Sequence, residues 1–364
     1  TPIEISINRD GKNLHAPLKV FRDRIEVSSI DAAYIIDSAT AYIKIRRFGA
    51  KTADDFKRAL LNLKKRGAQR LILDLRENGG GYFNAATALA SQFFVDKRLI
   101  VYTQGAHEGR TDYYSNADGI FGEGDVAVLI DEQSASASEI VAGAIQDLDR
   151  GIIVGRRSFG KALVQEQFGF GDGSALNLTV ARYYTPSGRC IQKLYAAKNG
   201  KRTDNPAIHP TEKRSLDSAG FRTASGRSVY GGGGISPDIW VSTDTSNVNS
   251  FYRAIRQANL IERYVYSRLT RAVPAYSIEN YLEGYWLADS EYEKFLQFVR
   301  NQGIDYTEPE AYATKHLVRN DIEALVGRFY FGSEAFFKVR NRSDKMLAEA
   351  LLALNSQSDR QEVQ

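Results

Sequence analysis

The sequence is poor in the residues that cross-link a chain or bind metal ions. It contains one cysteine, Cys190, and four histidines that are spread along the chain. A single cysteine excludes an internal disulfide, and neither residue type shows the spacing of metal ligands. We therefore expect no metal site and no cofactor.

Long apolar runs and a strong excess of one charge are also lacking. No segment has the length and apolarity of a membrane-spanning helix, and the first residues lack the charged-then-apolar pattern of a signal peptide. The net charge is only +4, with acids and bases mixed, which excludes the concentrated basic face typical of nucleic-acid-binding proteins. Because the chain starts at Thr1 rather than Met, we expect that an N-terminal segment with its targeting signal has been removed.

The middle of the chain alternates between strand and helix patterns. Apolar strand-like runs and segments of helical spacing follow each other, which predicts an α/β core with a parallel sheet. The expected strands are 42–46, 71–75, 99–102, 126–131 and 152–155, and the expected helices are 52–67, 85–94 and 139–147.

The two flanks have different patterns. Residues 1–27 hold one hairpin, which is too little for a domain. Residues 193–234 are polar and end in four glycines, so we expect a long flexible insertion there. From 246 to 364 the pattern is helical, and Ser290 with Glu293 predicts a capping box at the start of one helix.

Candidate catalytic residues lie in the loops that follow three of the expected strands. In a parallel sheet these loops gather at one edge, and the unit from 126 to 155 is a single crossover, so Ser136 and Lys161 should lie close together. A serine needs a base to become a nucleophile, and a lysine serves as one where a dry setting favours the uncharged amine. Gln165 is suited to orient that amine, because it adds no negative charge.

Each of these residues also has an ordinary interpretation. Small residues before a helix are usually caps, a lysine after glycine is usually solvated, and a glycine run usually marks a turn. A phosphate-binding loop at 155–161 is excluded, since Ala162 stands where serine or threonine is needed and 163–168 alternate like a strand. Only the joint arrangement favours catalysis.

Taken together, these segments resemble the C-terminal processing peptidases, also called tail-specific proteases, which are Ser/Lys-dyad serine peptidases. The matching segments, in the family's order, are 42–48, 74–81, 134–140, 155–165, 181–189 and 234–238. The resemblance implies Ser136 as nucleophile, Lys161 as base and Gln165 as the residue that orients the lysine. It implies an oxyanion hole formed by the backbone of Ala137 and a glycine of the 79–81 turn. Gly80 is the first candidate for that glycine, and Gly81 is the second.

The resemblance also implies a domain organisation. We expect a ClpP/crotonase-like α/β protease core with a mostly parallel sheet at 28–245, followed by an α-helical C-terminal domain at 246–364. Family members carry a PDZ domain before the core, and residues 1–27 match only its last strands. The position of Gly79 is more often proline or serine in the family, a change that a turn should tolerate.

The expected function is that of a serine endopeptidase. It would cleave unfolded or C-terminally exposed polypeptides through an acyl-enzyme, with the substrate added as a strand along 176–184. The resemblance places it in a bacterial periplasm or cell envelope, with homo-oligomer or adaptor contacts through the helical domain. The alternatives are a non-catalytic peptide-binding scaffold on the same fold and, more distantly, an acyl-thioester hydratase, for which the sequence offers no glutamate candidate.

Overall fold

The computed structural model describes most of the chain. Outside the description lie residues 1, 10–11, 14–15, 24–26, 194–195, 199–200, 204–219, 272–276, 285–286 and 362–364. Much of the insertion expected at 193–234 therefore lies outside the described residues.

A six-stranded sheet forms the centre of the molecule, and its strands are parallel except for the antiparallel edge strand β5. In spatial order the strands are β18 (Ile239–Trp240), β11 (Ile152–Gly155), β10 (Val126–Ile130), β7 (Arg70–Asp74), β6 (Thr40–Ile45) and β5 (Ile30–Ile35). The central strands are mostly apolar and buried, because both faces of the sheet are covered.

One face of the sheet packs against three helices that alternate with the strands. Leu71, Leu73 and Val128 point to this face and contact the same apolar cluster as Phe56 and Ile140 of the helices. The helices are α1 (Thr52–Lys65), α2 (Phe83–Ser91) and α3 (Ala137–Asp147). The predicted α/β core with its mostly parallel sheet is thus confirmed.

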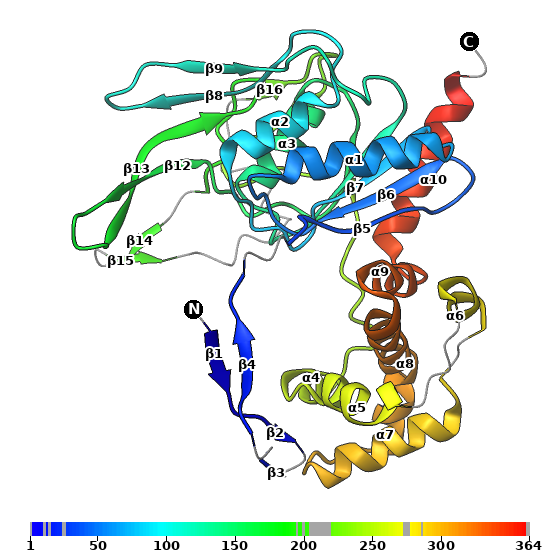
Figure 1. Cartoon of the computed structure of the whole chain (residues 1–364). Helices are drawn as coiled ribbons and strands as arrows, with labels where there is room; N and C mark the ends of the chain where they lie inside the picture. The colour runs from blue at the N-terminus through cyan, green and yellow to red at the C-terminus, as the bar shows by residue number, and fades with distance from the viewer. Residues whose placement is uncertain are drawn as a thin grey trace.

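The opposite face of the sheet packs against α10 (Lys345–Gln361), which comes from the far end of the chain. The alternate strand residues Ile72 and Leu129 form a second apolar cluster with Met346, Leu347 and Leu354. Figure 1 shows this red helix beside the blue strands of the sheet. The expected boundary at 245/246 grouped α10 with the helical domain, whereas its apolar stripe packs on the core.

A second sheet is antiparallel and extends from one end of the core. Its order is β12 (Leu163–Gly169), β13 (Ala175–Tyr184), β8 (Leu99–Gly105) and β9 (Thr111–Tyr114). β12 follows the loop that contains Lys161, and it occupies an edge of the sheet. This sheet therefore forms a wall beside the candidate catalytic residues.

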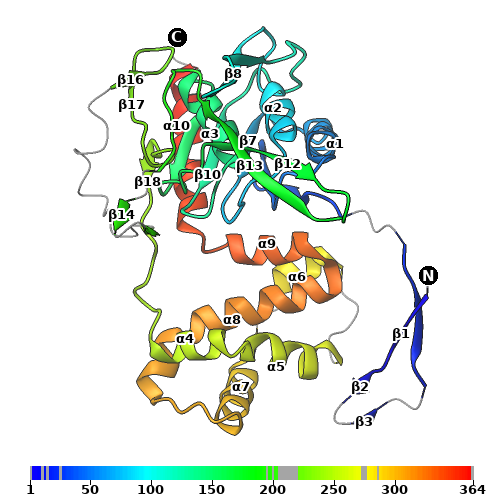
Figure 2. The same cartoon turned by 90° about the vertical axis from the view of Figure 1, so that its left-hand side faces the viewer.

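The helices before α10 build a core of their own. They are α4 (Ser250–Gln257), α5 (Leu260–Arg268), η1 (Leu269–Arg271), α6 (Ile278–Gly284), α7 (Asp289–Asn301), α8 (Glu308–Phe331) and α9 (Ser333–Asn341). Figure 2 shows them as a layer below the α/β core, with α9 nearest to it. The predicted capping box at Ser290 is wrong, because the N-cap of α7 is Ala288, two residues earlier, and it has no side-chain cap. A capping box is found at Thr307 and Glu310, at the start of α8.

The remaining strands are short. They pair as β1 (Pro2–Ile5) with β4 (Leu18–Phe21), β2 (Asn8–Arg9) with β3 (Lys12–Asn13), β14 (Ala196–Lys198) with β15 (Lys201–Thr203), and β16 (Phe221–Arg222) with β17 (Ser228–Val229). Both views show the N-terminal hairpin apart from the core. Among the described residues, no helix is both long and apolar enough to cross a membrane.

Candidate active site

Three serines precede or begin α3, and their surroundings differ. Ser134 is fully buried, and its hydroxyl donates to the carbonyl of Leu75 at 2.8 Å. Ser138 is also fully buried, and its hydroxyl donates to the carbonyl of Asn78 at 2.9 Å. Ser136 is only half-buried and lines a cavity of about 820 Å³. Of the three, Ser136 is therefore the one placed to meet a substrate.

The backbone of Ser136 has an unusual conformation. Its φ is +54° and its ψ is −109°, a combination that is strained for a residue with a side chain. Such strain is concentrated at functional sites, where surrounding contacts enforce it. Ser136 is also the N-cap of α3, so the unpaired N–H groups of the first helical turn lie next to it.

Lys161 lines the same cavity from the next loop. This loop connects β11 to β12, and Gln165 at the start of β12 also lines the cavity. Among the described residues, no hydrogen bond joins the Ser136 hydroxyl to the Lys161 amine or gives Gln165 a side-chain partner. The structure thus brings the three predicted catalytic residues to one cavity, without a hydrogen bond between their described side chains.

Glu139 connects the two loops that carry Ser136 and Lys161. Its Oε2 accepts the backbone N–H of Ser136 at 2.8 Å and that of Lys161 at 2.9 Å. Its Oε1 accepts the Ser158 hydroxyl at 2.5 Å and the Gly160 N–H at 2.7 Å. One fully buried carboxylate therefore fixes the distance between the two loops.

The ionisation of Glu139 reflects a balance between burial and hydrogen bonding. Burial raises the pKa of this carboxyl to about 7, even though its four hydrogen-bond donors favour the charged form. The Tyr183 hydroxyl reinforces the same connection, since it lies 3.1 Å from the carbonyl of Ser136 and 2.8 Å from that of Lys161. Burial raises the pKa of Tyr183 well above its usual value, so this hydroxyl remains a donor.

The glycine turn after β7 packs directly on the nucleophile loop. A Cβ built on Gly80 would lie 2.6 Å from the carbonyl oxygen of Ala135 and 2.9 Å from the Cβ of Ser136. The N–H of Gly80 donates to Oδ1 of Asn78 at 2.9 Å, so it is not free to bind an oxyanion. The N–H groups of Gly81 and Ala137 have no acceptor among the described residues, which makes Gly81 the better candidate of the two glycines.

Only part of the expected position of the substrate strand is already paired on both sides. Ala181 and Arg182 of β13 pair with β12 on one side and with β8 on the other, whereas the β8 ladder does not extend to residues 176–180. β12 is one of the two edge strands of this sheet, β9 being the other, and it begins two residues after Lys161. A peptide bound along β12 would therefore pass beside the candidate catalytic residues.

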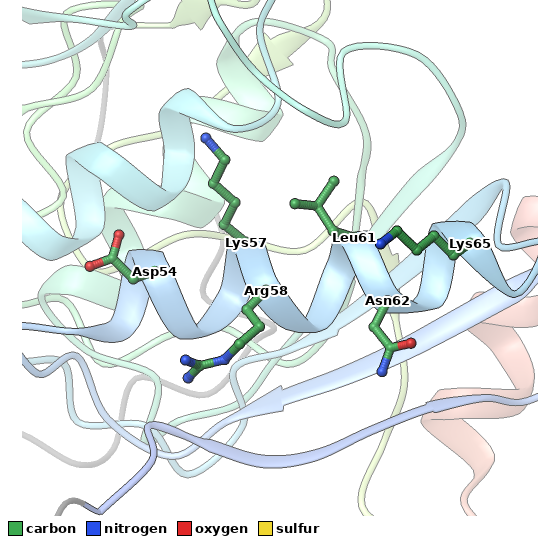
Figure 3. A pocket seen from close by; sticks show the side chains of 6 residues that line it. All are labelled: Asp54, Lys57, Arg58, Leu61, Asn62 and Lys65. Carbon is green, nitrogen blue, oxygen red and sulfur yellow. The ribbon is translucent and has the colours of Figure 1, made fainter.

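A second hollow, of about 540 Å³, lies along the exposed side of α1. Figure 3 shows the side chains around it, which all come from this helix: Asp54, Lys57, Arg58, Leu61, Asn62 and Lys65. It shares Asp54 with the cavity of Ser136. Its lining residues include no serine, threonine or cysteine, so the larger cavity, which contains Ser136, is the candidate active site.

Glu139 is the functional residue that the sequence reasoning did not identify. The signal was present, because a serine followed three residues later by glutamate has the spacing of a capping box. That pattern predicts a local contact to the N-cap, but it gives no information about Lys161. Since four donors occupy its carboxylate and it does not line the cavity, Glu139 does not supply the acid/base group that a hydratase would need.

A serine at a helix N-terminus and a lysine in one cavity are the parts of a Ser/Lys hydrolase site. Residues 39–201 match Peptidase family S41, and residues 251–332 match a family of unknown function, DUF8443. The predicted resemblance to C-terminal processing peptidases is thereby confirmed, and the matched segment lies in the α/β core.

Individual relatives agree with this match. The carboxy-terminal-processing protease of Bartonella bacilliformis is 38% identical over 197 residues, which are 53% of this chain and 45% of that protein. The carboxyl-terminal-processing protease of Picosynechococcus sp. is 39% identical over 153 residues, or 42% of this chain and 36% of that protein. The chain thus spans less than half the length of these relatives. Among solved structures, the photosystem II D1 C-terminal processing protease is 26% identical with a TM-score of 0.44, over 67% of this chain and 56% of that one.

Proposed function

We propose that this protein is a serine endopeptidase that cleaves unfolded or C-terminally exposed polypeptides. The observation that carries the proposal is that Ser136 alone, of the three serines around the start of α3, shares a cavity with Lys161. The S41 match supports the same reaction class. Because the chemistry needs only these side chains and backbone N–H groups, the proposal includes no metal or cofactor.

The proposed reaction has two steps. The amine of Lys161 takes the hydroxyl proton as Ser136 attacks the peptide carbonyl, and it returns that proton to the leaving amine. Water then hydrolyses the acyl-enzyme: the Lys161 amine takes a proton from the attacking water and returns it to the leaving oxygen of Ser136. The N–H groups of Ala137 and Gly81 stabilise the oxyanion, while Gln165 orients the lysine.

The proposal extends to the substrate and the setting. An extended peptide pairs with the open edge of β12 through main-chain hydrogen bonds, so its backbone, rather than one particular side chain, is recognised. The helical region around α4 to α8 forms contacts with a second copy or an adaptor. We propose a bacterial periplasm or cell envelope as the location, since the named relatives include bacterial processing proteases.

Cleavage of unfolded casein tests the proposal. Ser136→Ala and Lys161→Ala should each lower the rate about 1,000-fold or more, because nucleophile and base act as one unit. The exposed residues Ser356 and Lys65 provide matched controls, and Ser356→Ala and Lys65→Ala should cleave like the wild type. Equal cleavage by all variants would refute the dyad.

A different outcome would favour the scaffold alternative. If the wild type binds unfolded casein but does not cleave it, a non-catalytic peptide-binding function gains support. The absence of a hydrogen bond between the described Ser136 and Lys161 side chains is the observation in its favour.

A further inference from the structure

A carboxylate of the C-terminal helix reaches the turn that packs on the nucleophile. Oδ2 of Asp344, one residue before α10, accepts a hydrogen bond from Nη1 of Arg76 at 2.6 Å. The other oxygen of Asp344 caps α10 by accepting the N–H groups of Met346 at 2.9 Å and Leu347 at 3.1 Å. One side chain thus joins the start of α10 to the end of β7.

The guanidinium of Arg76 is bound by two carboxylates, those of Asp344 and Asp74. Its Nη2 donates to the fully buried Asp74 at 2.6 Å, and its backbone N–H donates to the same carboxylate at 2.9 Å. Although burial raises the pKa of Asp74, the charges of Arg76 and Lys44 hold it below its usual range, so the carboxylate is ionised at neutral pH. With two negative partners, the guanidinium has one fixed orientation.

A second helix contacts the same residue through Lys44. Nζ of Lys44 donates to the backbone carbonyl of Arg76 at 2.9 Å and lies 5.6 Å from the ring centre of Phe337 in α9. A cation over an aromatic face is attracted to it. Residues after position 330 therefore reach Arg76 directly through Asp344 and indirectly through Phe337, which lies near Lys44.

The turn that starts at Arg76 leads directly to the nucleophile. The N–H of Glu77 donates to Asp131 at 3.0 Å, and the carbonyl of Asn78 accepts the N–H of Ala135 at 3.0 Å. Gly80 then packs against Ser136. Displacement of Arg76 would move this turn, and with it the proposed oxyanion donor Gly81.

We propose that Asp344 is a positioning residue for the active site, acting through Arg76 on the 76–81 turn, so that the peptidase site is completed by the C-terminal helix. Asp344 lies outside the segment that matches the peptidase family, which ends at residue 201. The inference rests on the proposed function and adds to it a residue that touches neither substrate nor nucleophile.

The substitution Asp344→Ser separates the two roles of this side chain. A serine hydroxyl still caps α10 but is too short to reach Arg76. We expect kcat on unfolded casein to fall about tenfold or more with KM nearly unchanged, because a displaced oxyanion donor acts mainly in the transition state. Inhibition by a peptide aldehyde, whose adduct with Ser136 places an oxyanion in the same position, should weaken by a similar factor.

Two further variants control the experiment. Asp289→Asn removes a carboxylate that pairs with Lys315 at 3.0 Å and Arg319 at 3.1 Å on the helical surface, and it should leave kcat unchanged. Phe337→Leu removes the ring above Lys44 but keeps the apolar contact, and it should lower kcat in the same direction as Asp344→Ser. Wild-type kcat in Asp344→Ser, or an equal loss in Asp289→Asn, would overturn the inference.

Amide hydrogen exchange of the 76–81 segment gives a readout that does not depend on activity. We expect faster exchange in Asp344→Ser than in the wild type and Asp289→Asn. If the wild type fails to cleave casein but this difference is found, the proposed function is wrong and the structural connection holds. Unchanged exchange would refute the connection, whatever the activity.

Discussion

Glu139 shows at the scale of one residue how the two loops that carry the proposed catalytic residues are joined. Its carboxylate accepts the backbone N–H groups of Ser136 and Lys161 as well as two further donors. Because all four donors belong to these neighbouring loops, the residue contributes to the stability of the fold and to the relative position of the loops. The same burial that orders the loops makes its negative charge unfavourable, and its pKa rises to about 7.

The raised pKa of Glu139 predicts a pH-dependent stability. The folded-state value of about 7 lies above the ordinary glutamate value of 4.5, so this group's contribution is fully present below pH 4.5 and is lost as the pH rises through 7. The total is about 3 kcal/mol. Glu139→Gln cannot ionise, so the free energy of unfolding of the wild type minus that of the variant should fall between pH 5 and pH 8, as measured by urea unfolding.

The exposed Glu132 serves as the control for this measurement. It pairs with Arg156 at 2.7 Å outside the buried network, so Glu132→Gln should not reproduce the change. A pH-independent difference between the wild type and Glu139→Gln would contradict the assignment. We also expect Glu139→Gln to cleave casein more slowly, because an amide nitrogen cannot accept the N–H groups of both loops.

At the scale of elements, the turn after β7 shows why three consecutive glycines are not equivalent. Gly80 has a φ of +94° and touches the nucleophile loop, and Gly81 has a φ of +150° with Phe48 against it. Gly79 has no positive φ, and a Cβ added there would meet no atom within 4 Å. The turn therefore requires glycine at its second and third positions only.

Two alanine substitutions test this difference. Gly80→Ala should destabilise the fold by about 1–3 kcal/mol and largely abolish casein cleavage, since its Cβ would clash with Ala135 and Ser136. Gly79→Ala should stay within about 0.5 kcal/mol of the wild type and retain activity. Urea unfolding and casein assays measure both effects. Equal behaviour of the two variants would show that the close packing of Gly80 is not needed.

Strand and helix patterns predicted the central sheet at this scale, but they did not predict the edge strand of the second sheet or the cap of α7. The alternation between 42 and 155 predicted the parallel sheet except for the strand at 99–102, which lies in the antiparallel sheet as part of β8. The single crossover brought Ser136 and Lys161 to one cavity. The open edge of β12 was not predictable, because it depends on which strands pair across the second sheet. The cap at Ser290 was wrong because a local motif competes with other possible starts of the same helix.

At the scale of the whole molecule, the described residues form three apolar clusters. One lies on each face of the central sheet, and the third lies among the helices from α4 to α9. The apolar stripe of α10 was visible in the sequence, but helical spacing does not reveal which surface a stripe will cover. Its place on the sheet is a property of the tertiary structure.

Separate cores predict separate effects on unfolding. Leu347→Ala, in the contact of α10 with the sheet, should cost about 2–5 kcal/mol and lower the temperature at which activity is lost. Phe295→Ala, in the helical core, should cost a similar amount but lower a different calorimetric transition. A single transition that both substitutions shift equally would show that the two cores unfold together.

The position of α10 has a consequence for biosynthesis. Ribosomes make the chain from its N-terminus, so every strand of the central sheet is complete before this helix emerges. Until then one side of the sheet stays bare, and Arg76 lacks the partner that holds its guanidinium. On the proposed function and the proposed role of Asp344, a nascent chain would reach full peptidase activity only after translation has passed α10.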